Sequence, residues 1–363
     1  MKIGILGTRG IPNAYGGFEQ FAQYLAEGLV KKGHDVWVYN SSTHEYRKDE
    51  WRNIHIIYCQ DPENKIGTAG QFVYDFNCLI DSRKRNFDIL LQLGYTSNSV
   101  LYSLWPKKSI NIINMDGLEW KRAKYNQPTK AFLRQAEKWA VMHGNILIAD
   151  SIGIKDYLTK KYNKQSIYIP YGATIFRSPD SSVLTEFKLE PKKYFLVIAR
   201  MEPENNIEMI VSGYLQAPQP FPLVVVGNTK NKFGQYLKKK YGHQSIIFTE
   251  GIYDPGKLNN IRFFSALYFH GHSVGGTNPS LLEAMACSCT IAAHDNPFNK
   301  AILTDCSKYF RSANDVSAII DQLVQNNQFF QEAVAQNLEK IIQQYNWQKI
   351  IDAYESVFLT ALS

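Results

Sequence analysis

The sequence has few cysteines and no motif that pairs them. Five cysteines occur in 363 residues, and only Cys287 and Cys289 are near neighbours. A lone C-x-C is a poor match to the spacings of structural zinc sites and redox motifs. Buried thiols in a reducing compartment are therefore the better interpretation.

Long apolar runs are also absent. No run reaches the ~18 residues that a membrane-spanning helix needs, and the opening MKIGIL is too short for the apolar core of a signal peptide. We therefore expect a cytoplasmic protein. The net charge is +7, and no basic run resembles a nucleic-acid-binding arm, so no nucleic acid is expected as a partner. A diffuse basic face can still contact phosphates or an anionic membrane.

The glycine-rich stretch 7–20, GTRGIPNAYGGFEQ, lacks the spacing of the familiar nucleotide motifs. Its glycines do not form G-x-G-x-x-G, the next apolar run ends at Asn40 rather than at an acid, and no Gly-Lys-Ser/Thr appears. The stretch does follow a strand-like run and precede a helical pattern. That context favours an anion at the helix N-terminus, and an ordinary strand-to-helix turn is equally consistent with it.

Short β-rich runs alternate with helical patterns along the chain. The strand-like runs are KIGIL, DVWVY, IHIIY, DILLQL, INIINM, ILIAD and SIYIP, then YFLVIA, LVVVG, SIIFT, ALYFH and CTIAAH. Polar and turn residues at 171–193 interrupt the alternation. The pattern predicts two α/β domains with parallel sheets, at 1–172 and 173–345, with a helix at 346–362 that packs back on the first domain. A ligand of two facing domains would bind in the cleft between them.

The stretch 269–288, FHGHSVGGTNPSLLEAMACS, also joins a predicted strand to a predicted helix. Its glycines, Thr277, Asn278 and Ser280 offer backbone N–H groups and small polar side chains. Glu283 lies in the first turn or two of the helix, where a carboxylate can accept two hydrogen bonds from a ribose diol. A carboxylate that only stabilises the helix dipole is the alternative.

Several stretches together resemble one enzyme family. NPSLLEAMACS resembles the nucleotide-sugar motif of the family-4 glycosyltransferases. The stretches GTRGIPNAYGGFEQFAQYLAEGL, NMDGLEWKRAKY, ARMEPENNIEMI and HGHSVGGTNPSLLEAM resemble the rhamnosyltransferase-like branch of that family. The likeness implies a GT-B fold, an α/β architecture of two Rossmann-like domains facing across a cleft. It also implies a retaining transfer of a sugar, most like L-rhamnose from dTDP-L-rhamnose, to a lipid-linked cell-surface glycan.

The resemblance assigns roles to individual residues. The nucleotide would bind mainly to the second domain, with Glu283 on the ribose and the backbone at 276–280 facing the diphosphate. Gly16 and Gly17 would close on the same diphosphate from the first domain. The donor-binding residues implied in this way are Gly16, Gly17, Arg200, His272, Ser273, Gly276, Thr277, Asn278, Ser280 and Glu283.

One departure from the family pattern concerns the sugar. Gly275 stands where the family often has a glutamate, eight residues before Glu283. The contact with the sugar hydroxyls then passes to His272 or Ser273.

A second departure concerns the diphosphate. Asn205 stands where the family often has a lysine, five residues after the arginine matched by Arg200. Arg200 then carries most of the charge neutralisation, and its planar fork suits two phosphate oxygens. A surface ion pair with Glu202 or Glu204 is the alternative role.

Two acids follow the strand-like run INIINM, and we expect them on the acceptor side. An acceptor hydroxyl must lose its proton, and Asp116 or Glu119 could orient it or take that proton. An Asp-Gly turn and a first-turn helix acid are the alternatives. The resemblance adds that a donor phosphate oxygen can itself accept the proton. We expect Asp116, Arg200 and Glu283 to be the catalytic residues.

The stretch 120–144 interleaves six basic residues with aromatic ones. It could rest on an anionic membrane that carries the acceptor, or be a solvated helix face.

No Asp-x-Asp pair occurs, and neither a metal nor another cofactor is expected, because cationic and backbone groups can hold a diphosphate. Two other functions remain open on this fold: a nucleotide-sugar epimerase or hydrolase, and a catalytically silent nucleotide-sugar-binding protein.

Overall fold

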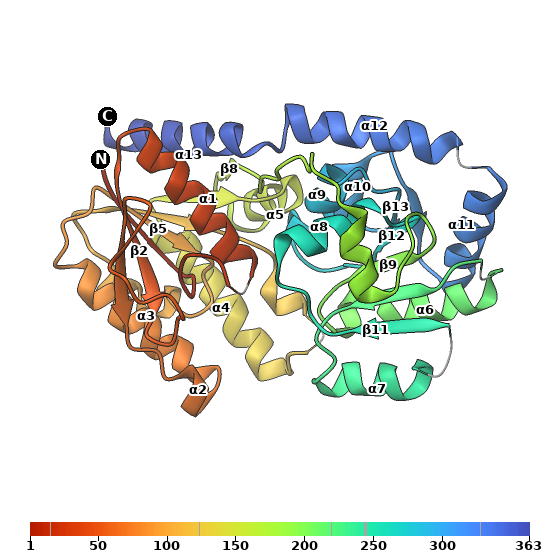
Figure 1. Cartoon of the computed structure of the whole chain (residues 1–363). Helices are drawn as coiled ribbons and strands as arrows, with labels where there is room; N and C mark the ends of the chain where they lie inside the picture. Colours follow the sequence, from red (N-terminus) through yellow and green to blue (C-terminus); the bar gives the residue numbers. More distant parts are fainter. Residues whose placement is uncertain (15, 123, 219, 243–244, 327) are drawn as a thin grey trace. The chain divides into compact units, whose positions relative to one another are not determined.

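The computed structural model describes residues 1–14, 16–122, 124–218, 220–242, 245–326 and 328–363. The chain divides into two compact units (Figure 1). The first comprises Met1–Lys121, Tyr125–Tyr171 and Trp347–Ser363, and the second comprises Arg122–Lys124 and Gly172–Asn346. Each unit is an α/β domain around one sheet, which confirms the predicted fold class.

The first unit contains an eight-stranded sheet in the order β3-β4-β2-β1-β5-β6-β7-β8, in which only the β3–β4 pair is antiparallel. Its strands are β1 (Lys2–Leu6), β2 (Asp35–Ser41), β3 (Glu50–Trp51), β4 (Ile54–Cys59), β5 (Ile89–Leu93), β6 (Ile110–Asn114), β7 (Ile146–Ala149) and β8 (Ile167–Tyr168). All five residues of β5 are buried, as expected for a parallel strand covered on both faces.

The helices of the first unit cover this sheet. They are α1 (Gly17–Lys31), α2 (Glu63–Ile66), α3 (Ala69–Ser82), α4 (Gln127–His143), α5 (Ile152–Tyr162) and α13 (Trp347–Leu362), with the 3-10 helices η1 (Ser99–Leu104) and η2 (Glu119–Lys121). Among the described residues, no helix is long and apolar enough to cross a membrane.

The C-terminal helix α13 packs on α1. Tyr24 and Trp347 stack at 4.5 Å between ring centroids, and Phe21 meets Tyr354 at 5.3 Å. A Cβ at Gly28 would lie only 2.3 Å from the Ile351 side chain, so a glycine is needed for the two helices to approach this closely. These contacts make the end of the chain part of the first unit.

The second unit contains a six-stranded sheet of parallel pairs in the order β11-β10-β9-β12-β13-β14. Its strands are β9 (Phe195–Ile198), β10 (Leu223–Val226), β11 (Ile246–Thr249), β12 (Leu267–His270), β13 (Ile291–His294) and β14 (Lys308–Phe310). Its helices are α6 (Ile207–Gln216), α7 (Lys232–Tyr241), α8 (Pro255–Phe263), α9 (Pro279–Ala286), α10 (Pro297–Leu303), α11 (Ala313–Gln325) and α12 (Gln328–Gln343), with the 3-10 helices η3 (Ser181–Phe187) and η4 (Pro203–Asn205).

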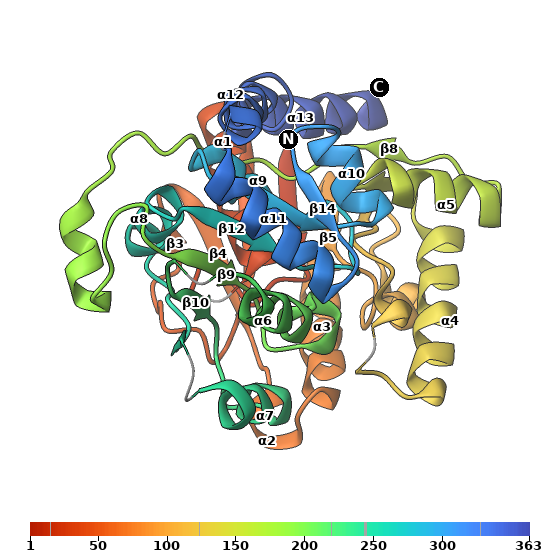
Figure 2. The ribbon, with the colours of Figure 1, turned by 90° about the vertical axis from the view of Figure 1, so that its right-hand side faces the viewer.

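Close helix packing also shapes this unit. Figure 2 shows α6 and α11 side by side, and a Cβ at Gly213 of α6 would lie 2.4 Å from the backbone oxygen of Ala313. Buried apolar residues from both helices join those of β9, β10 and β12 in one core. This core holds the central strands β9 and β12 as neighbours.

The sequence pattern did not predict two of the strands. β3 and β14 are two and three residues long, and each lies at an edge of its sheet. Neither of these two strands lies in an apolar run, so the pattern that identified the other strands does not reveal them.

Candidate functional site

Two loops of the second unit leave the same edge of the sheet. Parallel strands β9 and β12 are neighbours, so the loops at 199–206 and 271–278 start side by side. The backbone N–H and Oγ of Ser273 both donate to the backbone oxygen of Glu204, at 3.0 and 2.7 Å. The amide of Asn206 donates to the backbone oxygen of Gly271 at 2.8 Å. These bonds fasten the two loops to each other.

Two positions of the second loop favour glycine, each for a different structural reason. A Cβ at Gly271 would lie 2.0 Å from the backbone oxygen of Asn205, so the close approach of the loops requires a glycine. Gly275 faces open space but has φ +134, a conformation that L side chains rarely adopt. A glutamate at this position, as the resemblance would lead one to expect, would strain this backbone.

The segment 276–280 leads into the N-terminus of α9. Gly276 and Asn278 are partly exposed, whereas Thr277 is buried. The Asn278 side chain accepts a hydrogen bond from the backbone N–H of Ser280 at 2.9 Å and caps the helix. The Ser280 hydroxyl lies 2.9 Å from the Tyr268 hydroxyl, so both polar groups of Ser280 have partners within the unit. The helix end places N–H groups and a positive dipole end at this loop.

Glu283 lies on α9 above a buried arginine. The Glu283 Oε2 is 2.5 Å from Nη2 of Arg262, whose side chain is 3% exposed while that of Glu283 is 24% exposed. Burial disfavours the guanidinium charge, but Glu283 and other neighbours outweigh it and raise the pKa of Arg262. The Glu283 carboxylate is therefore accessible to solvent, and one of its oxygens contacts the buried Arg262 cation. Sequence reasoning missed Arg262, because arginine is rarely buried and no local pattern marks it.

Two histidines stack at the end of β12. The His270 and His272 rings are 4.5 Å apart at 18°. Burial and the nearby Arg200 lower the pKa of His272 to about 3, and burial also holds the pKa of His270 well below its usual value. Both rings are neutral at working pH. The amides of Asn296 and Asn299 each donate to the His272 backbone oxygen at 3.0 Å, which fixes this part of the loop.

Arg200 follows β9 and is exposed. Within the described residues, its guanidinium has no hydrogen bond or ion pair, so the alternative pairing with Glu202 or Glu204 is not present. Asn205 is 5% exposed, and its amide donates to the Arg200 backbone oxygen at 2.7 Å. The residue that replaces the family lysine therefore shapes the loop and supplies no charge.

The opening loop of the first unit is held by its own glycines and by Asn40. Gly7 has φ +89, and a Cβ there would lie 2.2 Å from the Leu93 backbone oxygen. The Asn40 side chain accepts from the N–H of Ile11 at 3.0 Å and donates to its backbone oxygen at 2.8 Å. Dinucleotide-binding proteins carry a ribose-binding acid at this position. Here Asn40 instead holds the loop through its two hydrogen bonds to Ile11.

The loop ends at the N-terminus of α1. Gly16 is the N-cap residue and Gly17 is the first residue of the helix. The Glu19 carboxylate accepts hydrogen bonds from the backbone N–H of Arg9 at 2.8 Å and from the Thr8 hydroxyl at 3.3 Å. Glu19 therefore stabilises the loop.

Asp116 and Glu119 follow β6 at the carboxyl edge of the same sheet, the edge that the opening loop also leaves. Both are partly exposed. The Asp116 backbone N–H donates to the Asn114 side chain at 3.1 Å, and the Tyr171 hydroxyl donates to Asp116 Oδ1 at 3.5 Å. The structure thus gathers the predicted acceptor-side acids with Gly16 and Gly17 at one edge of the first unit.

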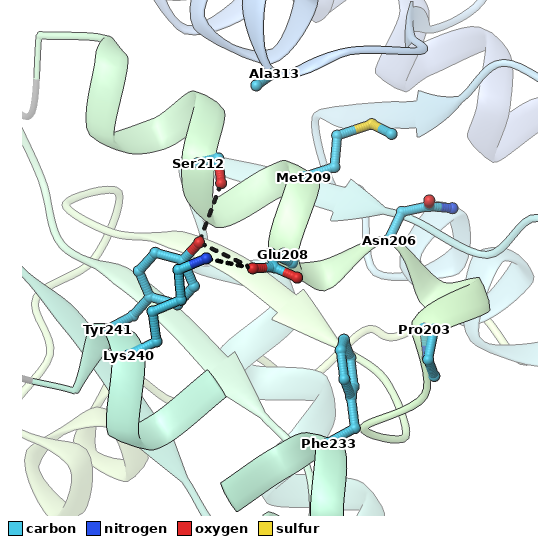
Figure 3. A pocket seen from close by; sticks show the side chains of 9 residues that line it. All are labelled: Pro203, Asn206, Glu208, Met209, Ser212, Phe233, Lys240, Tyr241 and Ala313. Atoms are coloured by element: carbon cyan, nitrogen blue, oxygen red, sulfur yellow. Dashed lines mark hydrogen bonds and ion pairs between the residues drawn. The ribbon is translucent and has the colours of Figure 1, made fainter. Parts of the chain in front are cut away.

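A cavity of about 380 Å³ lies between the far end of the loop 199–206, α6, α7 and the start of α11 (Figure 3). Its charged residues neutralise each other, because Lys240 donates to Glu208 at 2.8 Å. Neither Arg200 nor Glu283 lines it. The two fastened loops and α9, which carry the exposed Arg200 guanidinium and the accessible Glu283 carboxylate, are the better candidate site. In the part of the chain that the structure describes, no cluster of His, Cys, Asp or Glu is arranged to hold a metal ion.

Comparisons with known proteins support one kind of enzyme. Residues 185–352 match the family model described as "Glycosyl transferases group 1", and residues 1–174 match a domain of unknown function, DUF1972. An uncharacterized glycosyltransferase of Methanocaldococcus jannaschii is 22% identical, over 94% of this chain and 93% of its own length.

Solved structures share the fold. Sucrose-phosphate synthase of Thermosynechococcus elongatus is similar with a TM-score of 0.82 and 16% identity, over 100% of both chains. Anabaena HepE, solved in complex with UDP and glucose, is similar with a TM-score of 0.77 and 12% identity, over 99% of this chain and 100% of its own. The predicted GT-B fold is confirmed. Together with the family match, these findings support a glycosyltransferase of the GT-B type; the rhamnosyltransferase-like branch and the retaining mechanism stay predictions.

Proposed function

We propose that the protein is a retaining glycosyltransferase that moves L-rhamnose from dTDP-L-rhamnose to a lipid-linked cell-surface glycan. The observation that carries the proposal is the segment 271–283, where a fastened loop, a helix N-terminus and the accessible Glu283 lie together. The group 1 family match covers this segment, and complexes of HepE with UDP and with UDP-glucose support a nucleotide-sugar donor. The choice of rhamnose rests on the motif resemblance.

On the donor side, Glu283 accepts a hydrogen bond from the 3′-hydroxyl of the nucleoside sugar, the one sugar hydroxyl that a dTDP donor offers, and the N-terminus of α9 faces the diphosphate. Gly276, Thr277 and Asn278 bring the backbone close to the phosphates, and Ser280 supports them through its internal bonds. His272 and Ser273 lie beside the sugar. A neutral imidazole suits this role, because it can donate to one hydroxyl or accept from another.

Arg200 neutralises the charge that builds on the leaving diphosphate. We propose that no metal or other cofactor takes part. Transfer should then continue at the full rate in excess EDTA, and loss of activity that Mg²⁺ restores would contradict this point.

On the acceptor side, Asp116 positions the acceptor hydroxyl, and Glu119 lies near it. Gly16 and Gly17 offer the backbone of the α1 N-terminus to a donor phosphate, at a distance that a Cβ would prevent. Gly17→Val should keep nucleotide affinity and lose most of the transfer. A wild-type transfer rate in this variant would remove the opening loop from the site.

A lipid-linked acceptor would bring the protein to the inner face of the cytoplasmic membrane. The charged residues on the outside of α4 are cations, because its acid, Glu137, is 1% exposed and accepts from Lys161. Apolar side chains of α3, η1 and α4 itself are also exposed. We call this the α3–α4 surface; its residues are Val73, Phe76, Tyr102, Lys130, Arg134, Lys138 and Met142. Cations beside apolar groups suit an anionic bilayer.

An assay with and without acceptor tests the proposed reaction. The purified protein is incubated with dTDP-L-rhamnose or UDP-glucose, in the presence or absence of a lipid-linked glycan extract. We expect labelled sugar to enter the lipid fraction only with acceptor, and from dTDP-L-rhamnose in preference. Conversion of the donor without acceptor would indicate an epimerase or hydrolase, and no conversion under any condition would indicate a binding protein.

A further inference from the structure

We infer that Arg262 is a positioning residue, which fixes the Glu283 carboxylate so that the enzyme discriminates strongly among nucleotides by their ribose hydroxyls. The inference rests on the proposed ribose role of Glu283 and adds the residue that makes this role selective.

The Arg262 guanidinium makes hydrogen bonds to other side chains besides its contact with Glu283. It lies near the end of α8 and is 2% exposed. Its Nη1 donates to the Asn259 side chain at 3.0 Å, and its Nη2 donates to the Ser280 hydroxyl at 3.3 Å. The same Nη2 is 2.5 Å from Glu283 Oε2. A planar guanidinium anchored in this way has little freedom to turn.

This arrangement is poorly explained by stability alone. Removing a guanidinium and a carboxylate from water costs about as much as their attraction returns, and apolar residues of similar size often stabilise a fold equally well. The Nε of Arg262 is moreover buried without a hydrogen-bond partner in the described part of the chain, which adds to the cost. The Glu283 carboxylate contacts the buried Arg262 and still remains 24% exposed. This arrangement points instead to a ligand that binds the exposed side of the carboxylate.

The effect on recognition is geometric. Because Arg262 binds Oε2, this oxygen of the Glu283 carboxylate is held in place before any ligand arrives. A hydroxyl of the nucleotide then meets an acceptor whose direction is already fixed, and little rotational freedom is lost on binding. Without Arg262 the carboxylate loses this restraint, and its preference for a correctly placed hydroxyl should weaken.

The test compares two ligands that differ by one hydroxyl. Calorimetry measures the affinity for dTDP and for its 3′-deoxy counterpart in the wild type, R262M, R262K and K192M. The matched control, K192M, also removes a cation bonded near the end of α8, because Lys192 donates to the backbone oxygens of Phe263 and Ser265 at 2.6 and 3.1 Å. Circular dichroism and melting confirm that each variant is folded.

We expect the wild type and K192M to bind dTDP about tenfold or more tightly than the 3′-deoxy ligand, as a charged hydrogen bond implies. R262M should reduce this ratio to about threefold or less, and R262K should restore part of it. A folded R262M with the wild-type ratio would overturn the role of Arg262 and leave Glu283 in place. A wild type without discrimination would instead remove Glu283 from the ribose, and the inference with it. If R262M does not fold, R262K decides: a reduced ratio supports the inference, and an unchanged ratio overturns it.

Discussion

The side-chain amide of Asn205 donates to the backbone oxygen of Arg200 at 2.7 Å. This bond closes the loop after β9 and holds Arg200 at the edge of the sheet with its guanidinium exposed. Because the family lysine is replaced by this uncharged, buried asparagine, Arg200 is the cation that the loop contributes to the proposed site.

Arg200→Ala should lower turnover far more than it raises the Michaelis constant for the donor. Charge on the diphosphate grows as the glycosidic bond breaks, so it is greater in the transition state than in the bound substrate. Removing one group that stabilises such charge typically costs about 10²–10³ in kcat. Steady-state kinetics on Arg200→Ala and on Arg177→Ala, an exposed arginine in the connecting segment, measures the effect. A raised Michaelis constant with unchanged kcat would mean that Arg200 only binds the donor.

Asp116→Asn should spare donor binding and slow transfer by about tenfold or more, because the amide cannot take or strongly orient the acceptor proton. Asp156→Asn, an exposed acid of α5, is the matched control. Calorimetry gives the donor affinity, and transfer rates at varied acceptor concentration give kcat and the Michaelis constant for the acceptor. Wild-type transfer in Asp116→Asn would leave the residue with its turn-forming role only.

From the buried carboxyl of Asp75 we predict how the stability of the first unit changes with pH. Burial raises the pKa of Asp75 to about 7, although its bond from the Ser97 hydroxyl opposes this. The folded state therefore holds this proton more tightly than the unfolded chain, where the pKa is about 3.9. The contribution to stability is largest below that value, falls as the pH rises toward about 7, and then levels off.

Asp75→Asn should flatten this dependence. The variant should melt several degrees above the wild type at pH 8, and the difference should shrink toward pH 4. Asp88→Asn, an exposed acid of the same unit, should follow the wild type at each pH. A wild type and an Asp75→Asn variant that respond in parallel from pH 4 to pH 8 would show that Asp75 does not titrate as its burial implies.

The α3–α4 surface should bind anionic vesicles. Reversing two of its charges, R134E/K138E, should weaken binding to phosphatidylglycerol-containing vesicles by about tenfold or more, since each cation near such a surface contributes about 1 kcal/mol. The matched control, K238E/K239E, changes two exposed lysines of α7 equally. Equal losses in both variants would show that net charge alone attracts the protein and that the surface has no special role.

The sequence predicted those features that local patterns encode. Apolar runs identified the inner strands, because strands buried on both faces leave a continuous signal. The glycine-rich loops were recognisable from their place between strand and helix. The contact between Arg262 and Glu283 joins two helices through a buried charge, and the bonds of Asn40 to Ile11 and of Ser273 to Glu204 depend on how the chain returns to itself. No local period reports such contacts.

The most direct test of the proposed donor site is the affinity of Glu283→Gln for nucleoside diphosphate. In the proposed donor site this carboxylate binds the nucleoside sugar, and loss of its charge should weaken binding by about 10–100-fold in calorimetry while circular dichroism stays unchanged. If Glu283→Gln binds dTDP and UDP as tightly as the wild type does, the segment 271–283 does not recognise the nucleotide and the proposed donor site is wrong.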